Sequence, residues 1–130
     1  MKKSTVYSLL GILVILVGVV YFTRGQTSLE PGKYDDFAKC LTESGTKMYG
    51  AYWCSHCAAQ KKLFGSSVKY IPYVECDPRG DNADKAACDA AGVKGFPTWV
   101  FPDGTRSEGE TSLRQLSIKT NCELPAGTVE

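Results

Sequence analysis

Trp53-Cys54-Ser55-His56-Cys57 is the most informative run in this chain of 130 residues. An aromatic run over 47–52 precedes it and is typical of a strand, and a helical pattern over 58–64 follows it. A cysteine at the start of a helix is stabilised as a thiolate by the free backbone amides there, and a cysteine three positions later lies one turn further in. We therefore predict a redox pair in which Cys54 attacks and His56 adds positive charge beside it.

Two closely spaced cysteines also occur in sites of other kinds. Covalent haem attachment would need a histidine after the second cysteine, where this chain has Ala58. A structural zinc ion usually needs four ligands, but there is no second pair of this spacing and His56 is the only histidine. A copper site made of Cys54, Cys57 and His56 stays open, as does a purely structural disulfide. We expect no metal and no cofactor.

Gly95-Phe96-Pro97-Thr98 is the second informative run. A proline in front of a strand can form a cis peptide bond, which fixes a tight local geometry. Taken alone, Pro97 is an ordinary strand opener, but together with an upstream pair of cysteines it indicates a redox site. Trp53 and Phe96 flank the expected position of the sulfur atoms, and we predict that both contact the substrate.

Helical and strand patterns alternate around these runs. The predicted elements are, in order, a helix over 37–41 capped by Asp35 or Asp36, a strand over 47–52, a helix over 58–64, a strand over 68–76, a helix over 83–91 capped by Asp81 or Asn82, strands over 98–101 and 105–108, and a helix over 113–121 capped by Ser112. This order indicates an α/β fold whose mixed central sheet has helices on both faces. Pro72 indicates an edge strand. The aromatic side chains expected in the core or on the sheet are Tyr49, Tyr52, Trp99 and Phe101.

Residues 6–22 are uncharged and almost wholly apolar. A helix of this length spans about 25 Å, close to the ~30 Å thickness of a bilayer core. The run is longer than the ~7–15 residues of a signal-peptide core and no small-residue cleavage site follows it, so we expect a retained membrane helix, with cleavage as the alternative. The predicted domains are a membrane anchor over 1–25, a tether over 26–33 and a folded domain over 34–130.

Charge and cysteine content indicate in which compartment the domain is located. Lys2 and Lys3 ahead of the apolar run predict that the N-terminus stays in the cytoplasm, which places the domain outside it, at the cell membrane. Beyond Arg24 the acidic residues slightly outnumber the basic ones, so no surface for a nucleic acid is expected. Six cysteines in a small exported domain indicate a compartment in which disulfides form.

The runs around Cys54 and Pro97 together resemble the thioredoxin superfamily, whose pattern is W-C-x-x-C followed by G-[IVF]-P-T. The resemblance implies a thioredoxin-like fold in which Cys54 is the nucleophile and Cys57 resolves the mixed disulfide. It also implies that Pro97 packs against both cysteines and helps to present a partner chain. Thioredoxin itself has a buried acid at the position of Met48, so the resemblance implies that this proton relay is absent here.

A closer similarity covers nearly the whole soluble part. It is to the thioredoxin-like domain found with bacterial vitamin K epoxide reductase homologues, and the runs that carry it are 37–43, 48–54, 61–65, 73–76 and 96–99. That domain is often fused to a membrane quinone reductase, so the resemblance implies that a separate membrane reductase of this kind serves the present chain. The family commonly has Pro-His between the cysteines, where this chain has Ser55 and His56.

The other four cysteines are expected to form structural disulfides. A loop can close the spacing between Cys76 and Cys88, and the resemblance implies this pair. Cys40 and Cys122 are then left to pair with each other, and the alternative for them is two buried free thiols.

These observations predict an enzyme, a protein-disulfide oxidoreductase that oxidises exported cysteine-containing proteins and is reoxidised by the membrane reductase. A histidine directly before the second cysteine, here His56, is shared with DsbA and protein disulfide isomerase, which lie at the oxidising end of this class. The alternatives are a disulfide reductase and a copper-handling module that uses Cys54 and Cys57 as ligands.

Overall fold

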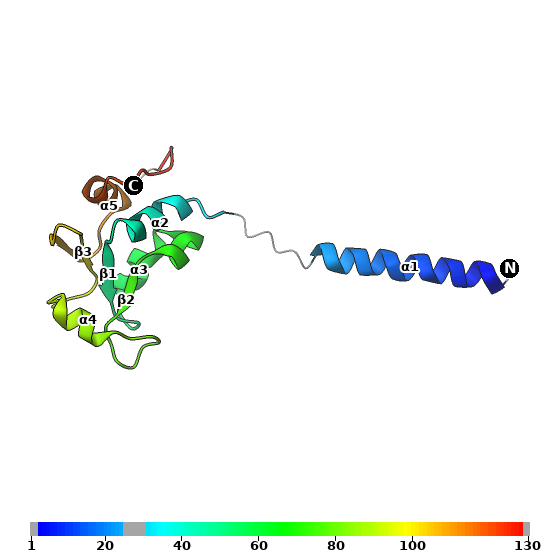
Figure 1. The fold of residues 1–130 in the computed structure, drawn as a ribbon, viewed down its shortest axis with the longest axis horizontal. Helices are drawn as coiled ribbons and strands as arrows, with labels where there is room; N and C mark the ends of the chain where they lie inside the picture. Colours follow the sequence, from blue (N-terminus) through cyan, green and yellow to red (C-terminus); the bar gives the residue numbers. More distant parts are fainter. Residues whose placement is uncertain (1–2, 25–30, 129–130) are drawn as a thin grey trace. The chain divides into compact units, whose positions relative to one another are not determined.

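The computed structural model describes residues 3–24 and 31–128. It divides into two units, Met1–Glu30 and Pro31–Glu130, and the first contains helix α1 (Lys3–Arg24) (Figure 1). Within the described residues, no helix combines enough length with enough apolar character to span a bilayer. The membrane helix expected from the sequence is therefore not identified in the structure. Most of the predicted tether, 26–33, lies outside the described residues.

The second unit is an α/β domain built on a mixed sheet of four strands. The strands, in sheet order, are β2 (Tyr73–Glu75), β1 (Lys47–Gly50), β3 (Thr98–Val100) and β4 (Arg106–Glu108). Strand β1 pairs parallel with β2 and antiparallel with β3, which pairs antiparallel with β4. The predicted mixed sheet is thus confirmed. Pro72 directly precedes edge strand β2, where its missing N–H interrupts no ladder.

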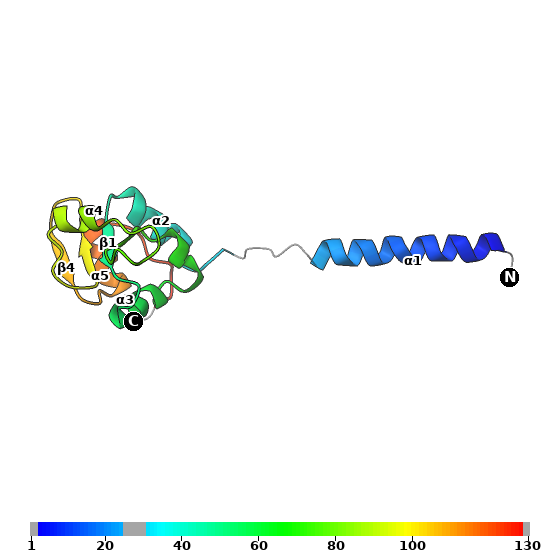
Figure 2. The same cartoon turned by 90° about the horizontal axis from the view of Figure 1, so that it is seen from below.

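Helices pack around this sheet (Figure 2). They are α2 (Asp35–Glu43), α3 (Ser55–Lys62), the 3₁₀ helix η1 (Gly65–Tyr70), α4 (Lys85–Ala90) and α5 (Leu113–Thr120). Apart from η1, the order of helices and strands is the one predicted. Ser112 caps α5 as expected. Its side chain accepts the backbone N–H of Gln115, and the side-chain oxygen of Gln115 accepts the backbone N–H of Ser112.

Two cores of different size lie on opposite faces of the sheet. The larger contains Met48 and Trp99, together with side chains from α2, α3 and α5. In it Phe37 stacks on Phe64 with ring centroids 6.1 Å apart, and Phe64 packs against Trp99 at 6.3 Å. Successive strand residues point to opposite faces, so Tyr49 belongs to the smaller core, which contains Cys88 of α4.

Most predicted elements differ from the structure by a few residues at their ends, and two of the differences have a clear physical cause. The strand expected over 68–76 begins only at Tyr73, because η1 occupies the preceding stretch and the ladder starts after Pro72. Helix α4 is capped by Asp84, whose side chain accepts the N–H of Ala87 at 2.9 Å, and not by Asp81 or Asn82. The positive φ of Asn82, 54°, lies outside the extended backbone that an N-cap adopts.

Two smaller predictions at single residues were wrong. Neither Asp35 nor Asp36 caps α2: the N-cap is Tyr34 without a side-chain bond, and the Asp35 carboxylate accepts the N–H of Gly32 at 3.0 Å. Tyr52 is 56% exposed and outside both cores, because β1 has ended before it and the chain has entered the turn that leads to α3.

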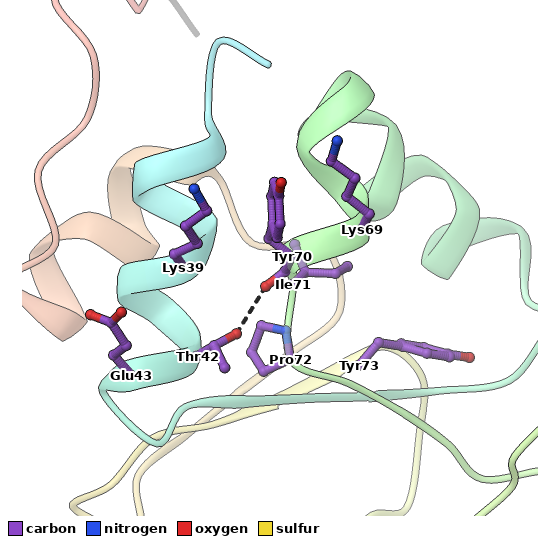
Figure 3. A pocket seen from close by; sticks show the side chains of 8 residues that line it. All are labelled: Lys39, Thr42, Glu43, Lys69, Tyr70, Ile71, Pro72 and Tyr73. Atoms are coloured by element: carbon purple, nitrogen blue, oxygen red, sulfur yellow. Dashed lines mark hydrogen bonds between the residues drawn. The ribbon is translucent and has the colours of Figure 1, made fainter. Parts of the chain in front are cut away.

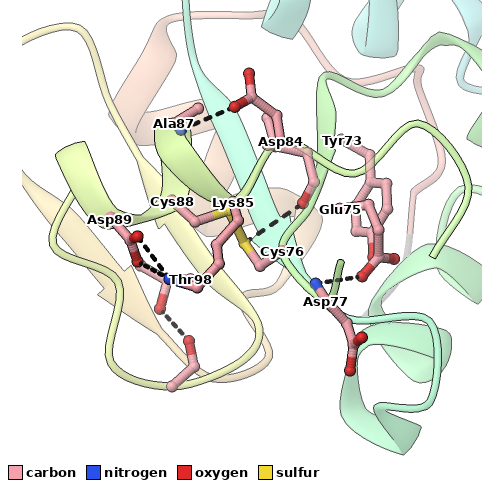
Figure 4. Close-up of a disulfide and its surroundings, with 12 residues drawn as sticks. Tyr73, Glu75, Cys76, Asp77, Asp84, Lys85, Ala87, Cys88, Asp89 and Thr98 are labelled. Carbon is pink, nitrogen blue, oxygen red and sulfur yellow. Dashed lines mark hydrogen bonds and ion pairs between the residues drawn. A yellow bond between two sulfur atoms is a disulfide. The ribbon is translucent and has the colours of Figure 1, made fainter. Parts of the chain in front are cut away.

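Two disulfides close the domain. Cys40 on α2 is bonded to Cys122 just beyond α5, and Cys76 beyond β2 is bonded to Cys88 on α4 (Figure 4). These are the two pairs proposed from the sequence. The first joins the two ends of the domain across a separation of 82 residues, whereas the second closes a separation of 12.

The difference in loop length predicts a difference in stabilisation. The double variant Cys40→Ala/Cys122→Ala should lose about 4.5 kcal/mol of unfolding free energy, and Cys76→Ala/Cys88→Ala about 3 kcal/mol, because the longer bridge restricts the unfolded chain more. Denaturant titration of the two variants beside the parent chain measures both values. A larger loss for the shorter loop would contradict this account.

Candidate active site

Cys54 lies at the N-cap of α3. Its Sγ accepts the backbone N–H of Cys57 at 3.1 Å, and its carbonyl accepts the N–H of Ala58, which begins the helix. The N-cap sulfur thereby pairs with one of the amides that a helix leaves free at its start. An N–H donor and the positive end of the helix dipole both favour the thiolate over the thiol. This geometry provides a physical basis for the attacking role predicted for Cys54.

Cys57 lies one turn further along α3. Both cysteines are free thiols and both are buried, with Cys57 1% exposed and Cys54 7% exposed. Burial, followed by the hydrogen bond with Cys54, raises the pKa of the Cys57 thiol to about 12. At neutral pH Cys57 therefore keeps its proton, and the two sulfurs are chemically distinct.

The structure places the run 95–98 beside the run 53–57. The Phe96–Pro97 peptide bond is cis and Pro97 is fully buried at the start of β3, next to the strand that leads into the cysteine pair. The rings of Trp53 and Phe96 meet edge to face at 6.2 Å. Together these two runs form a surface hollow of about 420 Å³. It is lined by Trp53, Cys54, Ser55, His56, Lys94, Gly95 and Phe96.

Trp53 is exposed but held in place. Its ring is 58% exposed, and its Nε1–H donates to Oδ2 of Asp77 at 2.7 Å. The Asp77 carboxylate also accepts two side-chain bonds from Arg79, at 2.8 and 3.0 Å. The bonds from Arg79 and from the indole hold the pKa of Asp77 well below its usual range, so it stays charged as an acceptor. The indole is therefore a preorganised wall of the hollow.

His56 is fixed by a residue that the sequence did not identify. Its Nδ1 lies 2.7 Å from Oε1 of Glu110, so the ring donates to this carboxylate, and 71% of its side chain is exposed. His56 borders the hollow that contains Cys54, as predicted from their spacing. Glu110 stands in the loop before α5, and no local pattern links it to a histidine so far upstream.

A polar cluster beside Cys57, partly buried, also escaped the sequence analysis. Lys61 stands near the end of α3, where a basic residue complements the helix dipole, but its Nζ lies 3.2 Å from the ring centroid of Tyr73. Burial lowers the pKa of Lys61. The Tyr73 hydroxyl in turn donates to Glu75, which is 6% exposed. Nothing in the local sequence distinguishes these residues from surface polar ones.

A second surface hollow contains no reactive group. It measures about 410 Å³ and lies between α2, η1 and the start of β2 (Figure 3). Lys39 and Lys69 both lie near the ring of Tyr70, at 4.7 and 5.0 Å, and the Thr42 hydroxyl donates to the Tyr70 carbonyl. The lining has neither cysteine nor histidine. Across residues 3–24 and 31–128, no three or more His, Cys, Asp or Glu side chains gather as a metal site.

A cysteine pair at a helix N-terminus, a buried cis proline at the start of the neighbouring strand and a mixed sheet define a thioredoxin-like domain with the CxxC pair of thiol–disulfide oxidoreductases. The chain belongs to the thioredoxin superfamily. It is 47% identical over 92 residues to "Thiol-disulfide oxidoreductase LTO1" of Arabidopsis thaliana, in a match that covers 67% of this chain and 24% of that protein.

Two further comparisons complete this picture. The solved thioredoxin of Fasciola hepatica is 21% identical and covers 67% of this chain and 91% of its own, with a TM-score of 0.42. No family model matches the chain.

The contrast between the two sulfurs can be tested by alkylation. At neutral pH we expect iodoacetamide to modify Cys54 at least ~100-fold faster than Cys57, because only the thiolate reacts and the raised pKa of Cys57 keeps it protonated. The Cys57 rate should rise about tenfold per pH unit up to about pH 12. Peptide mapping after timed quenching measures both rates in one sample. Equal rates at neutral pH would show that burial does not protect Cys57.

Proposed function

We propose that this chain catalyses thiol–disulfide exchange as an oxidant and passes a Cys54–Cys57 disulfide to exported cysteine-containing proteins. The observation that carries the proposal is the hydrogen bond from the Cys57 N–H to Cys54 Sγ at the start of α3. Stabilising the Cys54 thiolate stabilises the reduced form, and a more stable reduced form means a stronger oxidant.

Exchange starts when a substrate thiolate attacks Cys54 Sγ in the oxidised pair. A bond forms between the two sulfurs, the Cys54–Cys57 bond breaks, and Cys57 leaves with the electron pair and takes up a proton. A second substrate thiolate then attacks the first substrate sulfur. Cys54 leaves as the thiolate that the helix amide stabilises, and the substrate has gained a disulfide.

The walls of the active-site hollow favour a substrate of a particular kind. The exposed indole of Trp53 and the ring of Phe96 offer two apolar faces beside Cys54, and Lys94 adds a positive charge at the rim. Aromatic side chains held rigidly give contact area at little entropic cost. A cysteine in an extended segment with apolar neighbours fits this surface, and Pro97 would present its backbone.

Reoxidation needs an electron acceptor outside the domain. We propose a separate membrane reductase of the vitamin K epoxide reductase type, on the sequence resemblance described above. The uncharged run over 6–22 and the preceding Lys2 and Lys3 support a single-pass anchor with the domain outside the cytoplasm. Such an anchor would keep the domain at the same membrane surface as the reductase.

The direction of electron flow is tested by the reduction potential. Equilibrated with glutathione buffers, the full chain should give a potential well above thioredoxin's ~−270 mV and toward the ~−120 mV of DsbA, a gap worth about 7 kcal/mol. Cys54→Ser is the control and should abolish exchange. A potential near that of thioredoxin would favour the alternative, a disulfide reductase.

The proposed topology is tested separately. Protease added to intact spheroplasts should remove the domain, because the domain lies outside the cytoplasm, while a cytoplasmic marker protein stays whole. Immunoblotting against the C-terminal part follows the loss. Protection of the domain until the membrane is lysed would show that the proposed location is wrong.

A further inference from the structure

The polar cluster beside Cys57 consists of the buried Glu75 and the half-buried Tyr73 on β2, with the half-buried Lys61 on α3. The Tyr73 hydroxyl donates to Glu75 Oε2 at 2.7 Å, and the Asp77 N–H donates to Oε1 at 2.9 Å (Figure 4). Lys61 covers the Tyr73 ring at 3.2 Å. A carboxylate that is 6% exposed is costly to bury, and here both of its oxygens are satisfied. The fold therefore holds one carboxylate in a defined place near the resolving cysteine.

Gly50 and Gly80 have no side chain, and this leaves room for the polar cluster beside the Cys57 sulfur. A Cβ on Gly50, opposite Glu75 in the sheet register, would lie 2.8 Å from Cys57 Sγ and 3.3 Å from the Tyr73 hydroxyl. Both atoms thus border one small space and lie at most about 6 Å apart, a span that a single bridging water can close. A Cβ on Gly80 would lie 2.5 Å from Glu75 Cγ, so the absence of a side chain there makes room for Glu75.

Cys57 needs a proton acceptor because it must attack as a thiolate while buried. The titratable groups that act on Cys57 are Cys54 at the N-cap of α3 and Lys61 within α3. On β2, Tyr73 interacts with both Glu75 and Cys57. Burial and the hydrogen bond to Glu75 raise the pKa of Tyr73, so its hydroxyl stays protonated and passes a proton on without holding a charge. Glu75 is the carboxylate of the set.

We propose that Glu75 accepts the Cys57 proton through the Tyr73 hydroxyl, and that Lys61 stabilises the thiolate that forms. As the thiol proton moves through a bridging water to the Tyr73 oxygen, the Tyr73 proton moves to Glu75, leaving a thiolate and a carboxylic acid. The thiolate then bonds to Cys54 Sγ, and the partner sulfur leaves with the electron pair. When Cys57 is instead the leaving group, Glu75 returns the proton. This inference rests on the Cys54–Cys57 exchange of the proposed function.

A chromogenic aromatic disulfide separates the two sulfurs in the full chain. Cys54 releases the first coloured thiolate as it forms a mixed disulfide, and Cys57 releases the second as it closes the ring. The other four cysteines are in disulfides and stay silent. At about pH 6, Glu75→Gln should slow the second phase by ~100-fold, the lower end of what a positioned base contributes. The difference in second-phase rate between the variant and the parent chain should narrow toward about pH 10, where hydroxide takes the Cys57 proton.

Two further variants keep the test decisive. Glu43→Gln removes an exposed carboxylate of α2 and should change neither phase. Tyr73→Phe keeps the ring beneath Lys61 but deletes the hydroxyl, so it should reproduce the pH-dependent slowing, and it carries the test alone if Glu75→Gln does not fold.

Three outcomes would overturn the inference. An unchanged second phase in the folded variants would show that Glu75 is not the acceptor, and equal slowing at every pH would show a merely structural role. If the parent chain released only the first thiolate, it would not complete the exchange reaction. That result would overturn both the proposed function and the proton relay that rests on it.

Discussion

The hydrogen bond from the Cys57 N–H to Cys54 Sγ is the interaction on which the site depends. It requires α3 to begin at Ser55, and therefore β1 to end at Gly50 so that a short turn can deliver Cys54 to the N-cap. The same helix start turns the side chain of Cys57 inward, one turn further on. One backbone feature thus places a hydrogen-bonded sulfur at the helix start, while burial keeps the second sulfur protonated.

Much of this arrangement could be predicted from the sequence because it is local. A cysteine before a helical pattern, a proline before a strand and a serine three positions before a glutamine each determine their own backbone, so Cys54, Pro97 and Ser112 were placed correctly. The strand over 68–76 was not, because Pro72 divides it and 3₁₀ turns leave no periodic signal. Two of the predicted caps failed for a similar reason, since several acidic residues in each stretch were equally suitable.

The contacts that sequence reasoning missed all join residues that are distant along the chain or look ordinary. The Trp53–Asp77 and His56–Glu110 hydrogen bonds form only because the sheet order brings the loops that carry these residues to the same end of the sheet. From the sequence alone, Glu75 looks like a surface residue of a strand. Only the strand register shows that it lies opposite Gly50. Polar partners of this kind depend on tertiary placement, which a single sequence does not encode in any short pattern.

The Cys76–Cys88 bridge ties one wall of the active-site hollow to the covalent framework of the domain. The bridge holds the residue next to Asp77, and Asp77 anchors the indole that walls the hollow. A newly made chain with all six thiols reduced would lack this tie and the tie between its ends, so oxidation would firm both the domain and the wall of the hollow. The oxidation state of a distant pair of cysteines can thereby act on the shape of the hollow beside Cys54.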